Sequence, residues 1–523
     1  MPAQQKPSHY TFIKWLLVTV GAIVLLLLIA GPIVSRYAQS AITDLLAPLG
    51  GTVEDVSVNL FRRQIEVKNI SVYKTTQDES IPDSIRISSV AVRGVSIYQW
   101  LLNKKVDVRE LEIRTGFLRI NLATLRHDST KNGDDNPLKG VHVGRISIRD
   151  LTSALADNQT RVLEGVINLD VFGVSSTKDS VTSIGDYVVD AVEARLKKIK
   201  FYESNGLYEI RVSSVDLNTE KQELLIDTLY VVPLHAKYRF ARIVGKQTDR
   251  LSMFIQSINA TGLQYGMLRD SSVVARKIEI SGAEIYSFRD KRRPFRETKK
   301  KLLPMELLAE IRYPIEIDTI KISKANVTYE EFPEDGFESG KVTFQDLRAT
   351  FSNISNRTYY NKPKYATLAA STRLMGKGNL EAVFQLPIGG GTYHAKGRLS
   401  RFSLAHLNPA LENLAFISVE TGRLNDMDFA FDYTDKASTG KLTINYSDLK
   451  IKGLKKQADS EKNELKSLII NAIVKTNKDS NTPEDKRTGE ISFERDQQRQ
   501  IFNFWWKSLL SGIRSGVVGK KAS

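Results

Sequence analysis

The feature that most constrains the fold is a short run of residues that recurs along the chain. The run Val106-Asp-Val-Arg-Glu-Leu-Glu-Ile-Arg-Thr-Gly-Phe-Leu-Arg-Ile-Asn121 alternates apolar and polar residues, except that Arg109 and Glu110 stand together. Alternation with period two predicts a half-buried β-strand. An extra residue turns every later side chain to the opposite face unless the strand absorbs it in a bulge or a bend. The run therefore predicts an irregular strand that keeps one apolar face.

The same broken alternation, apolar-x-apolar-x-x-apolar-x-apolar, occurs in nine strict copies. In a chain with 41% hydrophobic residues, chance supplies only about two such matches. The repetition therefore predicts a repeated structural device. Two copies are followed by a second alternating run, and we expect hairpin turns at residues 114–116 and 323–325. The strict copies begin at Ile65, Val106, Val141, Ala194, Ile210, Ile278, Ile315, Val342 and Ile444.

The copies and the turns between them predict a mostly β protein built as a long antiparallel meander of hairpins. A stack of ordinary β-sandwich domains is the alternative, since such domains also show short strands with turns about every 8 to 12 residues. Helices are expected to interrupt the strands at only a few places. These places are Tyr98–Asn103, Thr182–Arg195 and Leu303–Ile311.

The segment from Phe12 to Val34 is apolar and carries a single charge, at Lys14. About twenty uncharged residues suffice for a helix to cross a bilayer core of roughly 30 Å, so we expect one transmembrane anchor. A cleaved signal peptide is the alternative, with Ala38-Gln-Ser40 before the cleavage site, but its apolar region is normally only about 7 to 15 residues long. Lysines before the span favour a cytoplasmic N-terminus with the bulk of the chain outside.

The composition excludes several classes of site. The chain has no Cys, and its six His show no ligand spacing, so thiolate chemistry and the common zinc sites are excluded. The net charge of +15 comes without a nucleic-acid-binding motif, and attraction to anionic membranes explains it equally well. Gly389-Gly-Gly391 lacks the rest of a phosphate loop, and the acidic pairs Glu330-Glu331 and Glu334-Asp335 are expected in an exposed turn. We expect no enzyme activity, cofactor, metal or nucleic-acid partner.

Two further segments bear on contact with membranes. The run Lys291–Lys301 is a basic loop, which is either a solvated face or a site of contact with lipid headgroups. Residues 501–513 place apolar side chains at helical spacing, with basic residues around them. Such an amphipathic helix suits a membrane interface, but the same stripe can fill the end of a sheet as ordinary core. The candidate membrane-interface residues are Trp505, Trp506, Lys507, Leu509 and Arg514.

A short tail, one membrane helix and hundreds of residues of hairpins of the type VDVRELEIRTGFLRIN together resemble the AsmA-like family of Gram-negative envelope proteins. That family belongs, with TamB-like proteins, to the repeating β-groove superfamily. The region Gly378–Tyr433, followed by Ser438–Leu454, is similar to the AsmA-type C-terminal region, with Gly397-Arg-Leu, Leu407-Asn-Pro409 and Thr421-Gly-Arg-Leu424 where that pattern places them.

The resemblance implies a long, twisted, taco-like sheet with an apolar concave floor and a polar outer wall. Proteins of this family take part in moving phospholipid between the inner and outer membranes or in maintaining the envelope, and the family has no catalytic residues to carry over. The chain is shorter than the longest members of the family.

These observations predict a single-pass inner-membrane protein, with the bulk of the chain in the periplasm, that binds and transfers lipid in an apolar β-groove. Its expected partners are phospholipid or another acyl-chain lipid, the membrane and an envelope protein. The alternative is a non-transporting scaffold or assembly factor for outer-membrane proteins. The candidate groove residues are Val106, Val108, Leu111, Ile113, Ile315, Ile317, Ile320 and Ile322.

The expected division of the chain follows the same reasoning. It comprises 1–11 as a cytoplasmic tail, 12–34 as the transmembrane anchor, 35–300 as an N-terminal repeated β-groove, 301–454 as the AsmA-like C-terminal β-groove region, 455–490 as a polar linker and 491–523 as a C-terminal amphipathic, Trp-rich helix.

Overall fold

The computed structural model shows a mostly β protein with few helices. The chain divides into two compact units, Met1–Asp227 (unit 1) and Thr228–Ser523 (unit 2), and strand β11 (Glu223–Pro233) contains the dividing position. The expected membrane span lies outside the described residues, among which no helix is long and apolar enough to cross a membrane. The structure describes residues 39–59, apart from 41, 45, 48 and 49, and residues 63–74, 83–96, 99, 103, 105–121, 140–157, 160–176, 187–264, 272–296, 299–358, 363–454 and 486–518.

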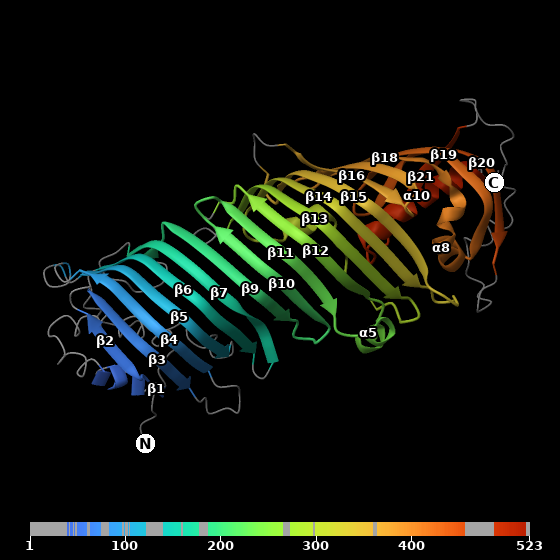
Figure 1. Ribbon diagram of the computed structural model, residues 1–523. Helices are drawn as coiled ribbons and strands as arrows, with labels where there is room; N and C mark the ends of the chain where they lie inside the picture. Colours follow the sequence, from blue (N-terminus) through green and yellow to red (C-terminus); the bar gives the residue numbers. More distant parts are fainter. Residues whose placement is uncertain are drawn as a thin grey trace, which may run out of the picture. The chain divides into compact units, whose positions relative to one another are not determined.

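Unit 1 is a β-sheet in which successive strands lie side by side (Figure 1). Its strands are β1 (Gly51–Thr52), β2 (Asp55–Asn59), β3 (Gln64–Lys74), β4 (Asp83–Val95), β5 (Lys105–Asn121), β6 (Gly140–Asp157), β7 (Thr160–Ser176), β8 (Tyr187–Val188), β9 (Ala191–Tyr202) and β10 (Tyr208–Asn218). β1 and β2 both pair with β3, and β8 and β9 both pair with β7. The described pairs are antiparallel except for β5 and β6, which run parallel.

Unit 2 continues with strands that again pair in chain order, from β12 to β21. They are β12 (Asp249–Thr261), β13 (Val273–Asp290), β14 (Ile315–Phe332), β15 (Gly340–Ser355), β16 (Tyr365–Leu374), β17 (Gly378–Pro387), β18 (Tyr393–Ser403), β19 (Ile417–Tyr433), β20 (Ala437–Gly453) and β21 (Arg487–Glu494). The helical elements are α5 (Lys237–Val244), α7 (Pro304–Ala309), η3 (Leu404–Leu407), α8 (Asn408–Ala410), η4 (Leu411–Ala415) and α10 (Ile501–Val518).

Both units differ from the expected meander because each contains one parallel pair. β5 pairs with β6 starting with Lys105 beside Gly140, and β13 pairs with β14 starting with Val273 beside Ile315. A parallel pair needs a connection that returns the chain to the same end of the sheet, and in unit 2 this crossover contains α7. The expectation of a purely antiparallel sheet is wrong at these two pairs. Side chains alternate in the same way in both kinds of strand, so the sequence pattern does not carry strand direction.

The two expected hairpin turns are also wrong. β5 runs without interruption through Thr115, and β14 runs through Lys324. These residues have positive φ angles, 41° and 54°. A single residue in the left-handed conformation bends a strand without ending it. It breaks the alternation of side chains as a turn does, which is why the sequence suggested a turn at both places.

Most of the positions where the repeated run breaks its alternation share one backbone feature, a positive φ angle. In five of the nine copies, the second of the two adjacent x residues has a positive φ. At Arg109 and Glu110 it is instead the facing residue of β4, Gly94, that takes a positive φ of 71°. The register of β4 with β5 is the same on both sides of this point, so the two strands bend together without a bulge. The five left-handed residues are Asn69, Lys198, Gly282, Asp346 and Asp448.

The expected helices are confirmed in part. α7 lies within the helix expected at Leu303–Ile311, and in the short stretch Tyr98–Asn103 the described residues Gln99 and Asn103 are helical. The helix expected at Thr182–Arg195 is wrong in its described part, where Tyr187–Val188 form β8 and β9 begins at Ala191. The linker expected at 455–490 lies mostly outside the described residues, but strand β21 already begins at Arg487. The C-terminal helix expected from 491 begins at Ile501. The copy that begins at Ala194 had already predicted most of β9 as a strand, whereas β21 was missed because it is short and three of its eight residues are charged.

Candidate functional site

The apolar face of unit 1 is built from side chains that lie next to one another on neighbouring strands. Val108 of β5 lies between Val95 of β4 and Val143 of β6. These three side chains are buried and belong to one apolar cluster, against which Val106 and Leu111 also pack. Residues 106, 108 and 111 therefore share a face, although residues 109 and 110 interrupt the alternation between 108 and 111. The shared bend preserves the apolar face, as the repeated run predicts.

This apolar face is covered only in part. Ile42 and Leu46, in the helical stretch before β1, are 2% and 5% exposed and pack in the same cluster. Ile113 of β5 is only half-buried, and no described apolar side chain of β7, β9 or β10 is buried. Phe201 of β9 is 39% exposed. A second sheet packed face to face would bury such side chains, so unit 1 is not a closed sandwich at these strands.

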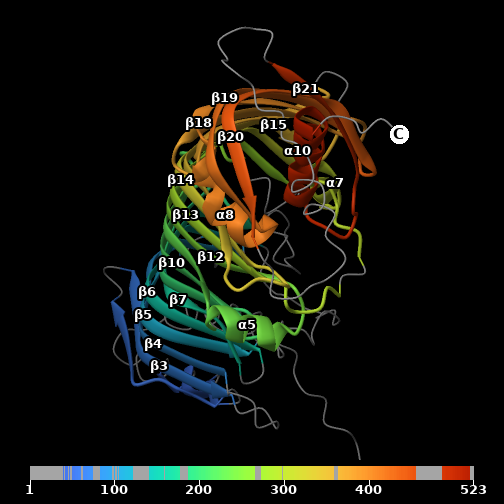
Figure 2. The same cartoon turned by 90° about the vertical axis from the view of Figure 1, so that its right-hand side faces the viewer.

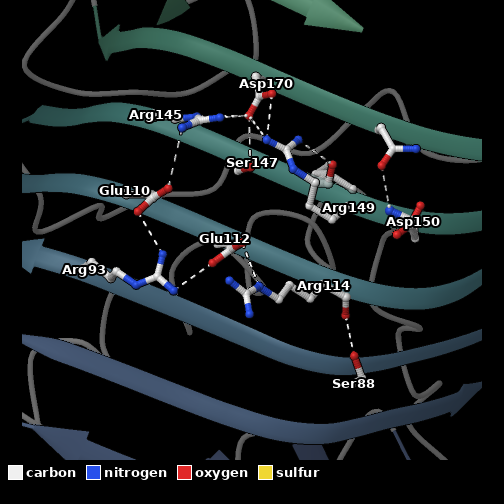
Figure 3. Close-up of polar contacts among 12 residues, drawn as sticks. Ser88, Arg93, Glu110, Glu112, Arg114, Arg145, Ser147, Arg149, Asp150 and Asp170 are labelled. Atoms are coloured by element: carbon white, nitrogen blue, oxygen red, sulfur yellow. Dashed lines mark hydrogen bonds and ion pairs between the residues drawn. The ribbon is translucent and has the colours of Figure 1, made fainter. Parts of the chain in front are cut away.

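The opposite face of unit 1 carries ion pairs that link four strands, β4 to β7 (Figure 3). Arg93 of β4 contacts Glu110 at 2.9 Å and Glu112 at 2.8 Å, and Arg114 contacts Glu112 at 2.7 Å. Burial alone would raise the pKa of Glu112, but hydrogen bonds from Arg114 and Arg93 outweigh it and lower this pKa. The face is thus polar, and its carboxylates are already paired with cations of the same sheet.

Asp170 of β7 is the last acceptor in this series. Its carboxylate accepts hydrogen bonds from Arg145 at 3.0 Å, from Arg149 at 2.8 Å and from the hydroxyl of Ser147 at 2.9 Å (Figure 3). Burial alone would raise the pKa of Asp170, but these hydrogen bonds outweigh it and lower this pKa. A carboxylate stabilised in its charged form contributes stability above its ordinary pKa and loses it as the pH falls through the lowered value.

We expect Asp170→Asn to destabilise unit 1 by about 2 kcal/mol at neutral pH, because two partly exposed arginines and a buried serine hydroxyl lose their charged acceptor. Urea unfolding of the variant and the wild type gives this difference. Asp107→Asn is the matched control, since Asp107 is an acid of β5 without an ion pair among the described residues. The difference should shrink as the pH falls below about 4; an equal loss in both variants would contradict the role assigned to Asp170.

The apolar face of unit 2 begins in a second cluster, on β12 to β15. Small or medium side chains lie at its centre, where Ile255, Ala283 and Ala325 are buried. The larger side chains around them are only half-buried, although they pack in the same cluster. The cluster contains only strand residues, as in a sheet with one layer, so within the described part of the chain these strands present an uncovered apolar face. The half-buried side chains are Met253, Ile258, Ile280, Ile322 and Leu347.

Four of the candidate groove residues lie on β14, in the middle of these strands. Ile315 is 8% exposed, and Ile317, Ile320 and Ile322 are half-buried. Ile320 lies opposite Phe351 of β15, which places both side chains on one face of the sheet. The other four candidates lie on β5 of unit 1. The candidate set is thus divided between the two units.

At the last strands of unit 2, a helix covers the apolar face. α10 lies against β20 and β21, within the curve of the sheet (Figure 2). Phe504 is 1% exposed, and the ring of Trp505 stacks on Phe384 of β17 with centroids 4.3 Å apart. Both helix residues belong to the large apolar cluster of β16 to β21, to which Met305 of α7 also contributes. Protein side chains therefore occupy the apolar face at this end of unit 2.

The candidate membrane-interface residues lie on different sides of α10. Trp505 and Leu509 pack in the large cluster, whereas Trp506 is 52% exposed and Arg514 is exposed. Lys507 is half-buried. The helix therefore uses one side as core and presents an aromatic ring and a cation on the other.

Sequence reasoning missed a buried carboxylate on β14, Glu330. This residue is 3% exposed and accepts hydrogen bonds from Lys237 of α5 at 3.0 Å, from Tyr286 of β13 at 2.5 Å and from Ser339 at 2.6 Å. Burial alone would raise the pKa of Glu330, but these hydrogen bonds lower it to about 2. Glu331 is also buried, at 9%. The interpretation of Glu330-Glu331 as an exposed turn is therefore wrong; no motif marks the site because its partners come from separate segments.

Two cavities in unit 2 are too polar to serve as acyl sites. One, of about 490 Å³, lies at the left-handed residues of β14 and β15 and is lined by charges of both signs, among them Glu284, Lys324 and Arg373. The other, of about 390 Å³, lies beside the Glu330 network and combines Tyr238 and Phe337 with polar groups. The uncovered apolar faces remain the better candidates for binding an apolar ligand.

The described residues include no group of three His, Asp or Glu that could hold a metal ion. A scan against models of protein families gives no match, and a search of curated proteins gives none either. The functional assignment accordingly starts from the arrangement of residues in the two units.

Proposed function

We propose that the protein binds acyl-chain lipids on the apolar faces of its sheets and contributes to the transfer of phospholipid between envelope membranes. The observation that carries this proposal is the uncovered apolar face of β12 to β15, where large side chains such as Met253 and Ile322 are only half-buried. Soluble proteins rarely expose contiguous apolar surface of this kind, and where they do it usually marks a binding site.

An acyl chain matches what such a face offers. Removing apolar surface from water stabilises a complex by about 25 cal/mol per Å², and this gain needs no directional polar contact. The apolar face supplies branched and aromatic side chains in rows across neighbouring strands. The opposite face of unit 1 is covered with paired charges, so it does not compete for the same ligand.

The proposed location comes from the sequence. The apolar segment 12–34 is proposed as a single inner-membrane anchor, with the bulk of the chain in the periplasm, as the resemblance to AsmA-like proteins implies. An anchored protein with apolar faces can take lipid from the membrane that holds it. An envelope protein is the proposed second partner, and the proposed function requires no covalent chemistry.

The test is a direct measurement of lipid. The full chain is purified from membranes in mild detergent, and bound lipid is quantified by mass spectrometry after extraction. We expect Ile317→Glu in unit 2 and Leu111→Glu in unit 1 each to lower the amount of bound lipid several-fold, because a carboxylate on an apolar surface is costly to desolvate. Lys321→Glu is the matched control, since Lys321 is an exposed residue of the same strand as Ile317.

Three outcomes of this measurement separate the proposals. Lipid bound by the wild type and the control, and lost from the two Glu variants, supports binding on the apolar faces. Lipid-free wild-type protein from native membranes would overturn the proposal and favour the scaffold or assembly factor. Equal lipid in all variants would place the lipid elsewhere, for example around the membrane anchor.

A further inference from the structure

The apolar face that is open at β12 to β15 continues beneath α10. β15 makes the connection, because Leu347 packs in the uncovered cluster and Phe351, four residues later, packs against the cluster that α10 covers. No left-handed residue lies between them, so the alternation places both on one face. The helix therefore sits on the same surface that is proposed to bind acyl chains, a few strands further along.

The side of α10 that faces the sheet makes the apolar contacts that a bound acyl chain would make. Phe504, Trp505, Leu509 and Ile513 pack against strand side chains of the large cluster. The ring of Phe504 also contacts Tyr433 of β19 edge to face, with centroids 5.8 Å apart. Without α10, this part of the sheet would present an apolar surface like that of β12 to β15.

The connection between β21 and α10 contains a buried arginine whose hydrogen bonds are incomplete. Arg495, just after β21, is 7% exposed, and its Nε and Nη1 have no hydrogen-bond partner among the described residues. Its Nη2 donates to the backbone carbonyl of Lys301 at 2.5 Å. A buried donor without a partner is unfavourable, and release of the helix would let water satisfy these two donors.

Two of the polar attachments of α10 to the sheet are ones that water can replace. The hydroxyl of Ser511 accepts from the backbone N–H of Ser492, and that of Ser515 accepts from the backbone N–H of Glu490, both at 3.1 Å. These N–H groups belong to β21, which pairs only with β20 among the described strands. If α10 leaves, solvent satisfies the same amides at little net cost.

We propose that α10 is a displaceable plug that occupies part of the acyl-binding face of unit 2 and must leave it before lipid can cover β16 to β21. This inference rests on the proposed function. It assigns to one segment a role in controlling how much of the face is available, and it makes α10 and the acyl chain competitors for the same surface.

A reversible lock on α10 tests the proposal. The hydroxyl oxygens of Ser438 on β20 and Ser508 on α10 are 2.7 Å apart, and both residues are buried. The chain has no Cys, so Ser438→Cys with Ser508→Cys introduces a single pair that can close into a disulfide. We expect the oxidised full chain to lose lipid-binding capacity, measured as bound lipid per chain after incubation with phospholipid vesicles, and reduction to restore it. Ser508→Cys alone, which should not respond to oxidation, is the control.

Failure of the plug and failure of the proposed function give different results in this experiment. Equal lipid binding by the oxidised and reduced forms, with lipid bound by both, overturns the plug and leaves acyl binding intact. Absence of lipid from every form, the wild type included, overturns the proposed function. If the double variant does not fold, hydrogen exchange on the wild type decides: added lipid should speed exchange of the amides of Glu490 and Ser492, and unchanged exchange with lipid bound overturns the plug.

Discussion

Gly489→Ala should separate α10 from the sheet. A Cβ atom at residue 489 of β21 would collide with the carbonyl oxygen of Gly512 and lie 2.7 Å from the backbone nitrogen of Gly516, both in α10. Backbone atoms of a helix cannot rotate away as a side chain does, so the helix must shift or leave. Such overpacking costs about 3 kcal/mol. We expect a lower urea midpoint and faster hydrogen exchange in peptides covering 487–494, whose amides α10 protects.

The control for this substitution is Gly140→Ala, at the start of β6. A Cβ atom there would make only ordinary contacts, the nearest at 3.4 Å with the side chain of Ser176. Neither glycine has a positive φ, so backbone strain does not enter the comparison. Exchange in 487–494 that is unchanged by Gly489→Ala would contradict the close approach of helix and strand. If α10 is a plug, the variant should also bind more lipid per chain than the wild type.

The repeated run identified the apolar face because the face depends on local order. Val106, Val108 and Leu111 lie in one cluster, as the broken alternation predicts. The same pattern marks Ile320 and Ile322 on β14. Side-chain alternation is a property of a single strand, so it can be inferred from neighbouring residues alone. The strand-rich fold follows from the same reasoning.

What the sequence did not reveal depends on partners distant in the chain. Whether β5 pairs in parallel with β6 is decided by the path of the connection, which leaves no trace in the strand pattern. The amphipathic stripe of α10 fitted a membrane and a core equally well, and only the position of Phe384 and other strand residues shows what Trp505 contacts. Gly489 matters because Gly512 and Gly516 lie against it, although many residues separate them in the sequence.

Glu330 is the strongest case of a residue whose role distant partners decide. Its sequence neighbours suggest an exposed acidic pair, yet cations and hydroxyls from α5, β13 and the segment before β15 surround it. Lys341 of β15 adds a further cation, 3.6 Å from its carboxylate. The network joins α5 to the strands on which the uncovered apolar face lies. Its loss should therefore affect the stability of unit 2 near the proposed binding face.

Glu330→Gln should destabilise unit 2 by about 3 kcal/mol at neutral pH, which is the free energy that corresponds to lowering the carboxyl pKa from 4.5 to about 2. The amide keeps the size of the side chain but leaves Lys237 without its counter-charge. Urea unfolding measures the difference, and Glu338→Gln, at an exposed acid in the same connection between strands, is the control that should change little.

The pH dependence of that difference has a definite sign. A carboxylate whose folded pKa is lowered contributes its full stability above the unfolded pKa and loses it as the pH falls toward the folded value. The gap between wild type and Glu330→Gln should therefore be constant from neutral pH down to about 5 and then close between about 4.5 and 2. A gap that persists unchanged at about pH 2 would mean that the substitution acts through packing, because most of the difference that depends on the charge of Glu330 should be lost by then.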